Sequence, residues 1–288
     1  MRTIARPWGP YIVLALPTTF FLALVAWPLF LLLRMSMSVP EHGRVFGVGL
    51  SFGNYAEVFT NPIFLETLFV TFRIGCWVSV CTLLLGFPLA IFIWRSKTRV
   101  RALVLFITLA PILVSVVVRS YGWVVLLSNK GLVNSFLLYF GVIDRPIRLI
   151  FNETGVIIGM VHVLLPFMVL SILSSLQSID KSLEDAASTL GATPFRTNID
   201  IVLPLVIPGV VAGVILVFIL AVGSFITPVL LGGQVVMTLP ILALQQFQTT
   251  FNWALGSAIA MVLLAAVLGM TLLFERVMRK RLLKGVGR

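Results

Sequence analysis

The sequence predicts an all-α membrane protein with six transmembrane helices and both termini in the cytoplasm. Of its 288 residues, 59% are hydrophobic and only 11% are charged, and the mean hydropathy is +1.11. A water-soluble domain of this length would be about half apolar and about one quarter charged. The chain therefore has too little polar surface for a soluble fold, and its apolar residues gather into runs that can each cross a bilayer.

Six apolar runs reach the roughly 20 residues that a transmembrane helix needs. The runs are continuous rather than alternating, which favours helices over the strands of a β-barrel. We expect the spans at Tyr11–Leu33, Thr67–Trp94, Ala102–Leu127, Thr154–Leu176, Leu205–Leu231 and Trp253–Glu275. Because no soluble-domain linker or internal repeat separates them, the sequence indicates a single transmembrane domain over residues 1–288.

The basic residues between the spans set the orientation. With a cytoplasmic N-terminus, fourteen Lys and Arg fall inside and five fall outside, as the positive-inside rule requires. The inside residues are Arg2, Arg6, Arg95, Lys97, Arg99, Arg101, Lys181, Arg196, Arg276, Arg279, Lys280, Arg281, Lys284 and Arg288. The outside residues are Arg34, Arg44, Lys130, Arg145 and Arg148. Such clusters are typical of topology signals, so the net charge of +11 does not indicate nucleic-acid binding.

The loops differ in character. The outside segments Ser51–Glu66 and Asn129–Phe151 combine turn residues with short apolar stretches such as Leu132–Phe140, which predict short helices at the membrane surface. The longest inside loop covers residues 177–204. No phosphate-binding G-x-x-x-x-G-K-[ST] motif and no cluster of metal ligands occur in the sequence. We therefore expect a protein that is not an enzyme and holds no cofactor of its own.

The loop at 177–204 predicts a helix–turn–helix. Ser182 and Asp185 form an S-x-x-D capping pattern, and Glu184 with Asp185 places carboxylates in the first turn. Leu183, Ala186, Ala187 and Leu190 share one apolar face at helical spacing. Gly191 is placed to end this helix in the left-handed conformation, and Thr193 with Pro194 to begin the next. Such a face suits a groove in a soluble partner, and a plain connector is the alternative.

This loop resembles the "EAA" loop of binding-protein-dependent transport permeases. The resemblance rests on Asp185-Ala186-Ala187, then Gly191, then Ile201, Leu203 and Pro204, with Asp185 standing where the family usually has Glu. It implies that Glu184, Asp185, Ala186, Ala187 and Gly191 dock on an ATPase subunit, which would bind ATP and Mg²⁺. It also implies the type I ABC importer permease fold and a location in the lipid bilayer of the bacterial inner membrane. The implied partners are a second homologous permease, which forms a heterodimer with this chain, two ATPase subunits and an extracytoplasmic solute-binding protein.

The resemblance extends over nearly the whole chain and is strongest to the spermidine/putrescine permeases. It is carried by Val118–Trp123, Lys130–Asn134, Gly155–Met160, Leu164–Phe167, Gly223–Gly233 and Asn252-Trp253. A polyamine is therefore the expected solute, with other amines, opines, aminophosphonates and thiamine as alternatives. An ion-coupled secondary transporter is disfavoured, because every Asp and Glu lies in a loop or at a span end.

Polar residues inside the spans are candidates for the translocation path, because their burial in lipid is costly. For Arg119 one alternative is a gate or solute contact, and the other is that it snorkels to the outer interface or bonds to carbonyls of a neighbouring helix. For His162 an interhelical hydrogen bond is favoured over solute contact. Tyr121 and Trp123 suit the aromatic belt at the outer interface, or a cation path through cation–π attraction.

The fifth span carries the other candidates for the path. Gly223, Ser224, Phe225 and Pro228 combine a small pair, a hydroxyl and a helix breaker. An interrupted helix exposes backbone groups to a cavity, and close helix packing through Gly223 is the alternative reading.

Overall fold

The computed structural model describes residues 9–39, 49–180 and 182–285, all of whose regular elements are helical. The contacts divide the chain into two compact units, Met1–Leu65 with Leu242–Ala265 and Glu66–Ile241 with Ala266–Arg288. The expectation of a single domain over residues 1–288 stays a prediction. Among the basic residues counted for orientation, Arg2, Arg6, Arg44, Lys181 and Arg288 lie outside the described residues.

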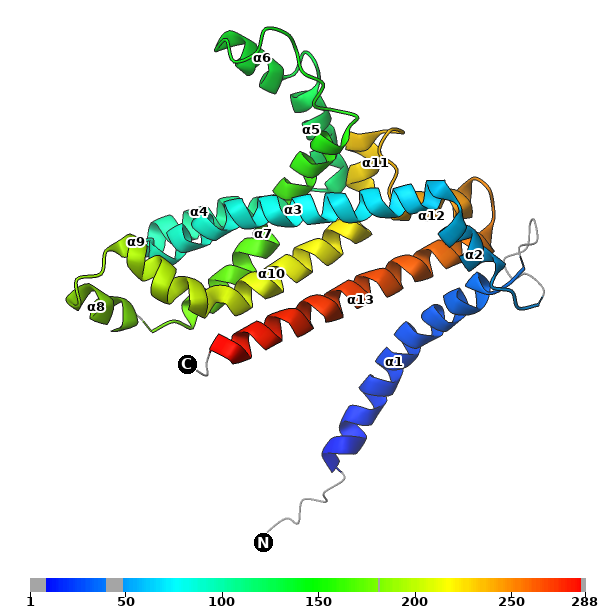
Figure 1. Cartoon of the computed structure of the whole chain (residues 1–288), viewed down its shortest axis with the longest axis horizontal. Helices are drawn as coiled ribbons and strands as arrows, with labels where there is room; N and C mark the ends of the chain where they lie inside the picture. Colours follow the sequence, from blue (N-terminus) through cyan, green and yellow to red (C-terminus); the bar gives the residue numbers. More distant parts are fainter. Residues whose placement is uncertain (1–8, 40–48, 181, 286–288) are drawn as a thin grey trace. The chain divides into compact units, whose positions relative to one another are not determined.

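The core of the second unit forms where three long helices meet: α3 (Pro62–Arg95), α7 (Glu153–Gln177) and α10 (Leu203–Gly223) (Figure 1). α7 is the most enclosed, with 56% of its most apolar window buried. Its first turn is fixed by Asn152, whose side chain accepts the N–H of Gly155 at 2.8 Å. Buried side chains from all three helices interlock here, among them Val78, Ile93, Met168, Ile172 and Val217.

The remaining long helices are α1 (Gly9–Ser36) and α13 (Trp253–Gly285). The short helices α2 (Gly53–Thr60) and α6 (Leu132–Tyr139) confirm that each of the two loops expected outside contains a short helix, and their place at the membrane surface stays a prediction. A further helix, α12 (Leu239–Gln248), was not expected. Within the first unit, the buried Asn54 donates from Nδ2 to the carbonyls of Ser36 and Ser38 at 2.9 and 2.8 Å, and so fixes α2 to the end of α1.

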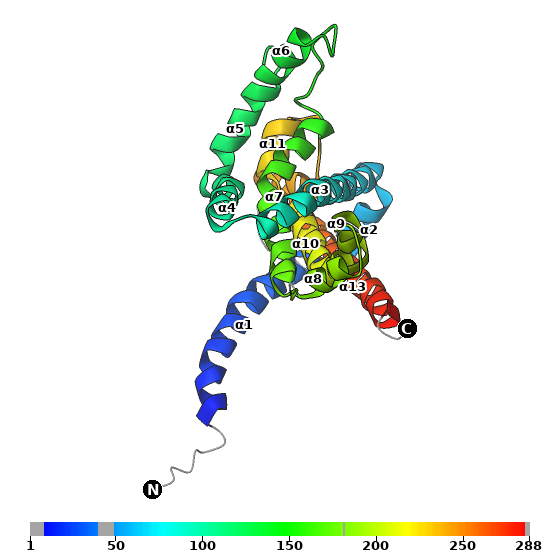
Figure 2. The ribbon, with the colours of Figure 1, turned by 90° about the vertical axis from the view of Figure 1, so that its left-hand side faces the viewer.

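Five helices in the described chain are long and apolar enough to cross a membrane, and the number rises to six when one bent pair of helices is counted as a single span. The prediction of six spans is therefore confirmed, but the expectation of one continuous helix over Ala102–Leu127 is wrong. The chain forms two helices there, α4 (Thr98–Leu113) and α5 (Val116–Leu127) (Figure 2). The segment Val116–Tyr139 is bent by 101° from α4. Pro111 cannot donate a hydrogen bond within the last turn of α4, and the backbone becomes extended at Val114, directly after that turn.

The expected span Leu205–Leu231 is also too long. α10 ends at Gly223, Ser224 is extended, and the short helix α11 (Ile226–Gly232) follows. Pro228 gives the physical reason: in a continuous helix its ring would clash with the carbonyl of Ser224, four residues earlier. The interruption expected from Gly223, Ser224, Phe225 and Pro228 is thus confirmed, and it ends the span.

Candidate functional site

The loop between α7 and α10 forms the predicted helix–turn–helix. It consists of α8 (Ser182–Thr189), α9 (Pro194–Thr197) and a single π-helical turn, η1 (Asn198–Val202), which runs directly into α10 (Figure 1). The capping differs from expectation. The backbone N–H of Ser182 donates to Asp180 Oδ1 at 2.9 Å, so Asp180 rather than Ser182 provides the side-chain acceptor. Hydrogen bonds from the backbone N–H and then the hydroxyl of Ser182 lower the pKa of the Asp180 carboxyl.

The predicted end of α8 at Gly191 is confirmed. Gly191 has φ +81°, in the left-handed region that a side chain disfavours. The N–H of Ala192 donates to the carbonyl of Ala187 and that of Gly191 to Ser188, both at 3.0 Å, which is the hydrogen-bond pattern of a Schellman motif. As predicted, α9 begins at Pro194, and the Thr193 hydroxyl accepts the N–H of Arg196 at 3.4 Å. The bend between the two helices is therefore rigid.

The side chains of α8 divide between two environments. Leu183, Ala186 and Leu190 are exposed, Leu190 to 88%, and they share one face at helical spacing. Ala187 is only 5% exposed and is covered by the chain itself. Asp185 is exposed, and no described residue pairs with its carboxylate. The side chain of Glu184 lies outside the described residues.

This loop is connected to the membrane helices at two points. Arg95, at the end of α3, donates from Nη2 to Asn198 Oδ1 of η1 at 2.8 Å. The helical backbone of η1 continues without a break into α10. A displacement of α8 and α9 can therefore reach both α3 and α10.

Arg119, Trp123 and His162 lie together in a surface groove of about 480 Å³ between the α4–α5 bend and α7. The Arg119 guanidinium donates to the carbonyls of Pro111 and Val114, the latter at 3.4 Å. Trp123 Nε1 donates to His162 Nδ1 at 3.2 Å, which confirms the interhelical hydrogen bond expected for His162. Tyr121 is exposed and does not line the groove.

The break between α10 and α11 leaves a second, separate set of candidates. Gly223 is exposed, and a Cβ added there would meet no described atom within 4 Å, so close packing through Gly223 is not its role in the described chain. Ser224 is half-buried and Phe225 is exposed, whereas Pro228 is buried. Of the candidates, only Arg119 and Trp123 line the groove with His162, and Gly223, Ser224 and Phe225 do not.

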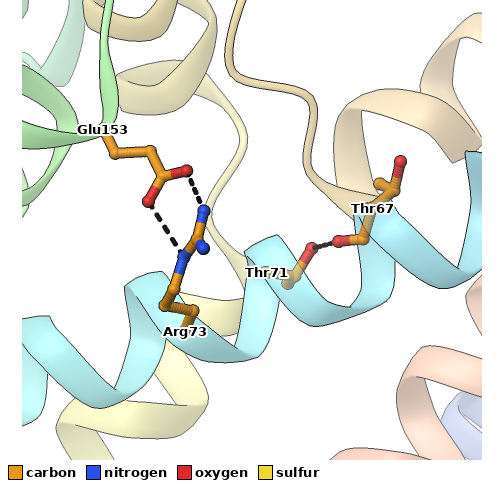
Figure 3. A network of polar contacts seen from close by, with 4 residues as sticks. All are labelled: Thr67, Thr71, Arg73 and Glu153. Atoms are coloured by element: carbon orange, nitrogen blue, oxygen red, sulfur yellow. Dashed lines mark hydrogen bonds and ion pairs between the residues drawn. The ribbon is translucent and has the colours of Figure 1, made fainter.

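An ion pair that the sequence does not predict joins Arg73 of α3 to Glu153, the first residue of α7 (Figure 3). Arg73 donates from Nη2 to Glu153 Oε1 and from Nε to Oε2, the latter at 3.1 Å, and its guanidinium also lies over the Phe69 ring. The side chain of Arg73 is 40% exposed and that of Glu153 is 33% exposed. An arginine inside an apolar run and a carboxylate at a span end were the available signals, but nothing local links residues 80 positions apart.

Comparison with known proteins gives a consistent assignment. The family described as "Binding-protein-dependent transport system inner membrane component" matches residues 78–282. The chain is 36% identical over 220 residues to the spermidine/putrescine transport system permease protein PotB of Salmonella typhimurium, covering 76% of each chain. It is 32% identical to PotB of Haemophilus influenzae, over 86% of this chain and 87% of that one.

Solved structures show the same architecture. A crystal structure of a bacterial ABC transporter involved in the import of the acidic polysaccharide alginate matches with a TM-score of 0.76. The match covers 96% of this chain and 97% of that chain at 20% identity, so it establishes the fold alone. Together these comparisons show that the chain belongs to the inner-membrane permeases of binding-protein-dependent ABC importers, with the type I fold. It is a multi-pass, non-catalytic subunit of that transport machinery.

Proposed function

We propose that this permease imports polyamines, spermidine or putrescine, across the inner membrane. The observation that carries the proposal is the 36% identity to spermidine/putrescine permeases over 220 residues. That similarity extends over 76% of the chain, so it supports the transport system as a whole. Discrimination between solutes is assigned to the extracytoplasmic binding protein that delivers them.

The assembly that we propose contains a second homologous permease, two ATPase subunits that bind ATP and Mg²⁺, and the binding protein. The single chain has surfaces that fit this assembly. Only 6% of the most apolar window of α1 is buried, so α1 presents apolar side chains to lipid or to the second permease.

We propose further that α8 is the contact with the ATPase. Its exposed face combines Leu183, Ala186 and Leu190 with the carboxylate of Asp185, which pairs with no residue that the structure describes. A narrow apolar face suits insertion into a groove, and a carboxylate can accept a charge-assisted hydrogen bond from Arg or Lys of the partner. Gly191 holds this face rigidly, and the connections to α3 and α10 carry its movement into the membrane.

Two substitutions test the contact. Ala186→Trp places a large side chain on the exposed face, where it blocks a groove without disturbing the loop itself. Gly191→Val forces a β-branched residue to positive φ, which costs at least roughly 1–2 kcal/mol and opens the bend. In reconstituted complexes we expect solute uptake and stimulated ATP hydrolysis to fall together, by roughly tenfold or more. An effect of this size is expected when one residue that anchors a protein interface is lost. Ala187→Trp is a poor probe, because Ala187 is buried by its own chain.

Thr189→Ala is the matched control, since it lies on the same helix and loses only a hydrogen bond to the carbonyl of Asp185. Full uptake by Ala186→Trp and Gly191→Val at normal membrane abundance would show that the loop is only a connector.

The identity of the solute is tested separately. Calorimetry of the partner binding protein against spermidine, putrescine, an aminophosphonate and thiamine should show binding of the polyamines. Tight binding of another solute would reassign the substrate and leave the importer assignment unchanged.

A further inference from the structure

A hollow at the corner between α3 and α4 is lined by both cationic and apolar side chains, and it lies apart from the groove at Arg119. It has a volume of about 640 Å³ and is lined by Trp94, Arg95, Ser96, Lys97, Thr98, Arg101, Ala102 and Leu105. Three of these side chains are cationic. Trp94, Ala102 and Leu105 form an apolar wall beside them. The hollow is therefore amphipathic, with its positive charges at the end of one span and the start of the next.

The cations of this hollow have spare binding capacity. Lys97 and Arg101 form no ion pair with any described residue. Arg95 is already engaged, because it donates to Asn198 and lies over the Trp94 ring at 5.8 Å. Lys97 and Arg101 are thus the groups available to an anion, while Arg95 and Trp94 form a fixed wall.

The backbone adds to this preference for an anion. Lys97 is the N-cap of α4, and its side chain makes no capping hydrogen bond. The first N–H groups of the helix, at Thr98 and the residues after it, have no intrahelical acceptor. They carry the partial positive charge of the helix dipole. Thr98 itself lines the hollow, so this positive end of α4 lies beside the cationic side chains.

From this arrangement we propose that the hollow binds the phosphate of an anionic phospholipid, with the glycerol and the start of an acyl chain against Trp94, Ala102 and Leu105. The location decides between ligands. The positive-inside rule puts the α3–α4 corner at the cytoplasmic surface of the bilayer, where anionic headgroups are concentrated. A soluble anion would not use the apolar wall, whereas a phospholipid matches both halves of the lining. Arg95, which also lines the hollow, connects it to η1 of the loop between α7 and α10 through its hydrogen bond to Asn198.

The test measures how much phospholipid stays bound to purified transporter complexes. Complexes in detergent are incubated with phosphatidylglycerol or phosphatidylethanolamine, and the bound lipid is measured by native mass spectrometry. The wild type should retain phosphatidylglycerol and not phosphatidylethanolamine. Lys97→Gln with Arg101→Gln should weaken retention about twenty-five-fold, since each basic residue contributes about a factor of five. Arg99→Gln with Arg276→Gln is the matched control. It removes the same charge from predicted cytoplasmic segments, and neither Arg99 nor Arg276 lines the hollow. This control should retain the lipid.

Each other result overturns the proposal. Equal losses in both double variants would mean that only diffuse surface charge attracts the lipid. Equal retention in both would mean that the hollow is not the site. Displacement of phosphatidylglycerol by inorganic phosphate alone would indicate a simple anion site. Efficient crosslinking of Arg101→Cys to the ATPase subunit, with no lipid retained, would assign the hollow to the protein partner.

Discussion

The ion pair of Arg73 and Glu153 joins α3 to the first turn of α7, the most enclosed helix of the described chain. Its geometry is bidentate, which is the strongest arrangement of a guanidinium and a carboxylate. In a helix surrounded by lipid or protein, an arginine that loses this partner keeps its charge and cannot be neutralised. Removing one partner should therefore cost more than removing both.

We expect Glu153→Gln and Arg73→Gln each to lower the amount of assembled permease several-fold in the membrane. The double variant Arg73→Gln/Glu153→Gln should recover most of that loss, since two amides can hydrogen-bond without an unpaired charge. Quantitative immunoblotting of the assembled complex measures the effect. If the double variant is as poor as the worse single variant, the two residues do not act as a pair.

Phe225 tests the exposed break between α10 and α11. If Ser224 and Phe225 line the path of the solute, Phe225→Ala and Ser224→Leu should each reduce uptake by roughly tenfold, the loss of about 1.4 kcal/mol of contact. Assembly and membrane level should stay normal, because neither side chain is fully buried. Val229→Ala, an exposed change on α11, is the control. Normal transport by both variants would remove this segment from the path.

At this scale, local rules predicted some residues well and could not predict others. Gly191 and Pro194 were assigned correctly because helix ends depend on backbone conformations that few residues tolerate. His162 was assigned correctly because a polar ring inside a span must find a partner. Arg73 and Glu153 were missed, because their pairing depends on how α3 and α7 pack and not on any nearby sequence.

The sequence predicts the number of transmembrane spans better than it predicts where a span is interrupted. Hydropathy detects apolar length, and it cannot distinguish one straight span from two helices bent by 101° within the same run. Pro111 and Pro228 mark the two interruptions, but prolines also occur inside α3 and α7, where the helix continues. Whether a proline ends a helix depends on what satisfies the freed carbonyls.

Arg119 performs that task at the α4–α5 bend, because its guanidinium bonds the carbonyls of Pro111 and Val114 at the end of α4. Arg119→Ala should remove about 1.5–3 kcal/mol of charged hydrogen bonding and lower membrane abundance several-fold. Uptake per assembled complex should stay close to wild type. Arg119→Lys should recover only part of the abundance, since an ammonium lacks the planar fork.

Uptake measured per assembled complex separates this structural role from a gate. A fall in specific uptake in Arg119→Ala, at unchanged abundance, would place Arg119 in the path of the solute instead. The apolar segments beside the bend give the control: Ile112→Ala shortens an exposed side chain of α4 and should change neither quantity.

For the whole molecule, the orientation rests on charge and remains a prediction. Fourteen basic residues on one side against five on the other require the N-terminus, the α3–α4 corner, the α8–α9 loop and the C-terminus to share the cytoplasmic side. Both proposals above depend on this arrangement. An ATPase reaches α8 only from the cytoplasm, and the anionic leaflet lies against the α3–α4 corner only there.

Cysteine labelling decides the orientation. In a Cys76→Ala/Cys81→Ala background, which removes both native cysteines, Lys130→Cys should react with an impermeant maleimide in spheroplasts with an intact inner membrane. Arg99→Cys and Lys284→Cys should react only after the membrane is opened. Lys130 lies in the turn before α6 and is exposed, as is Arg99 in the first turn of α4, so poor access does not explain an absent signal. Labelling of Arg99→Cys in intact spheroplasts would reverse the topology. It would place α8 and the basic hollow outside the cell, where neither an ATPase nor the anionic leaflet could meet them.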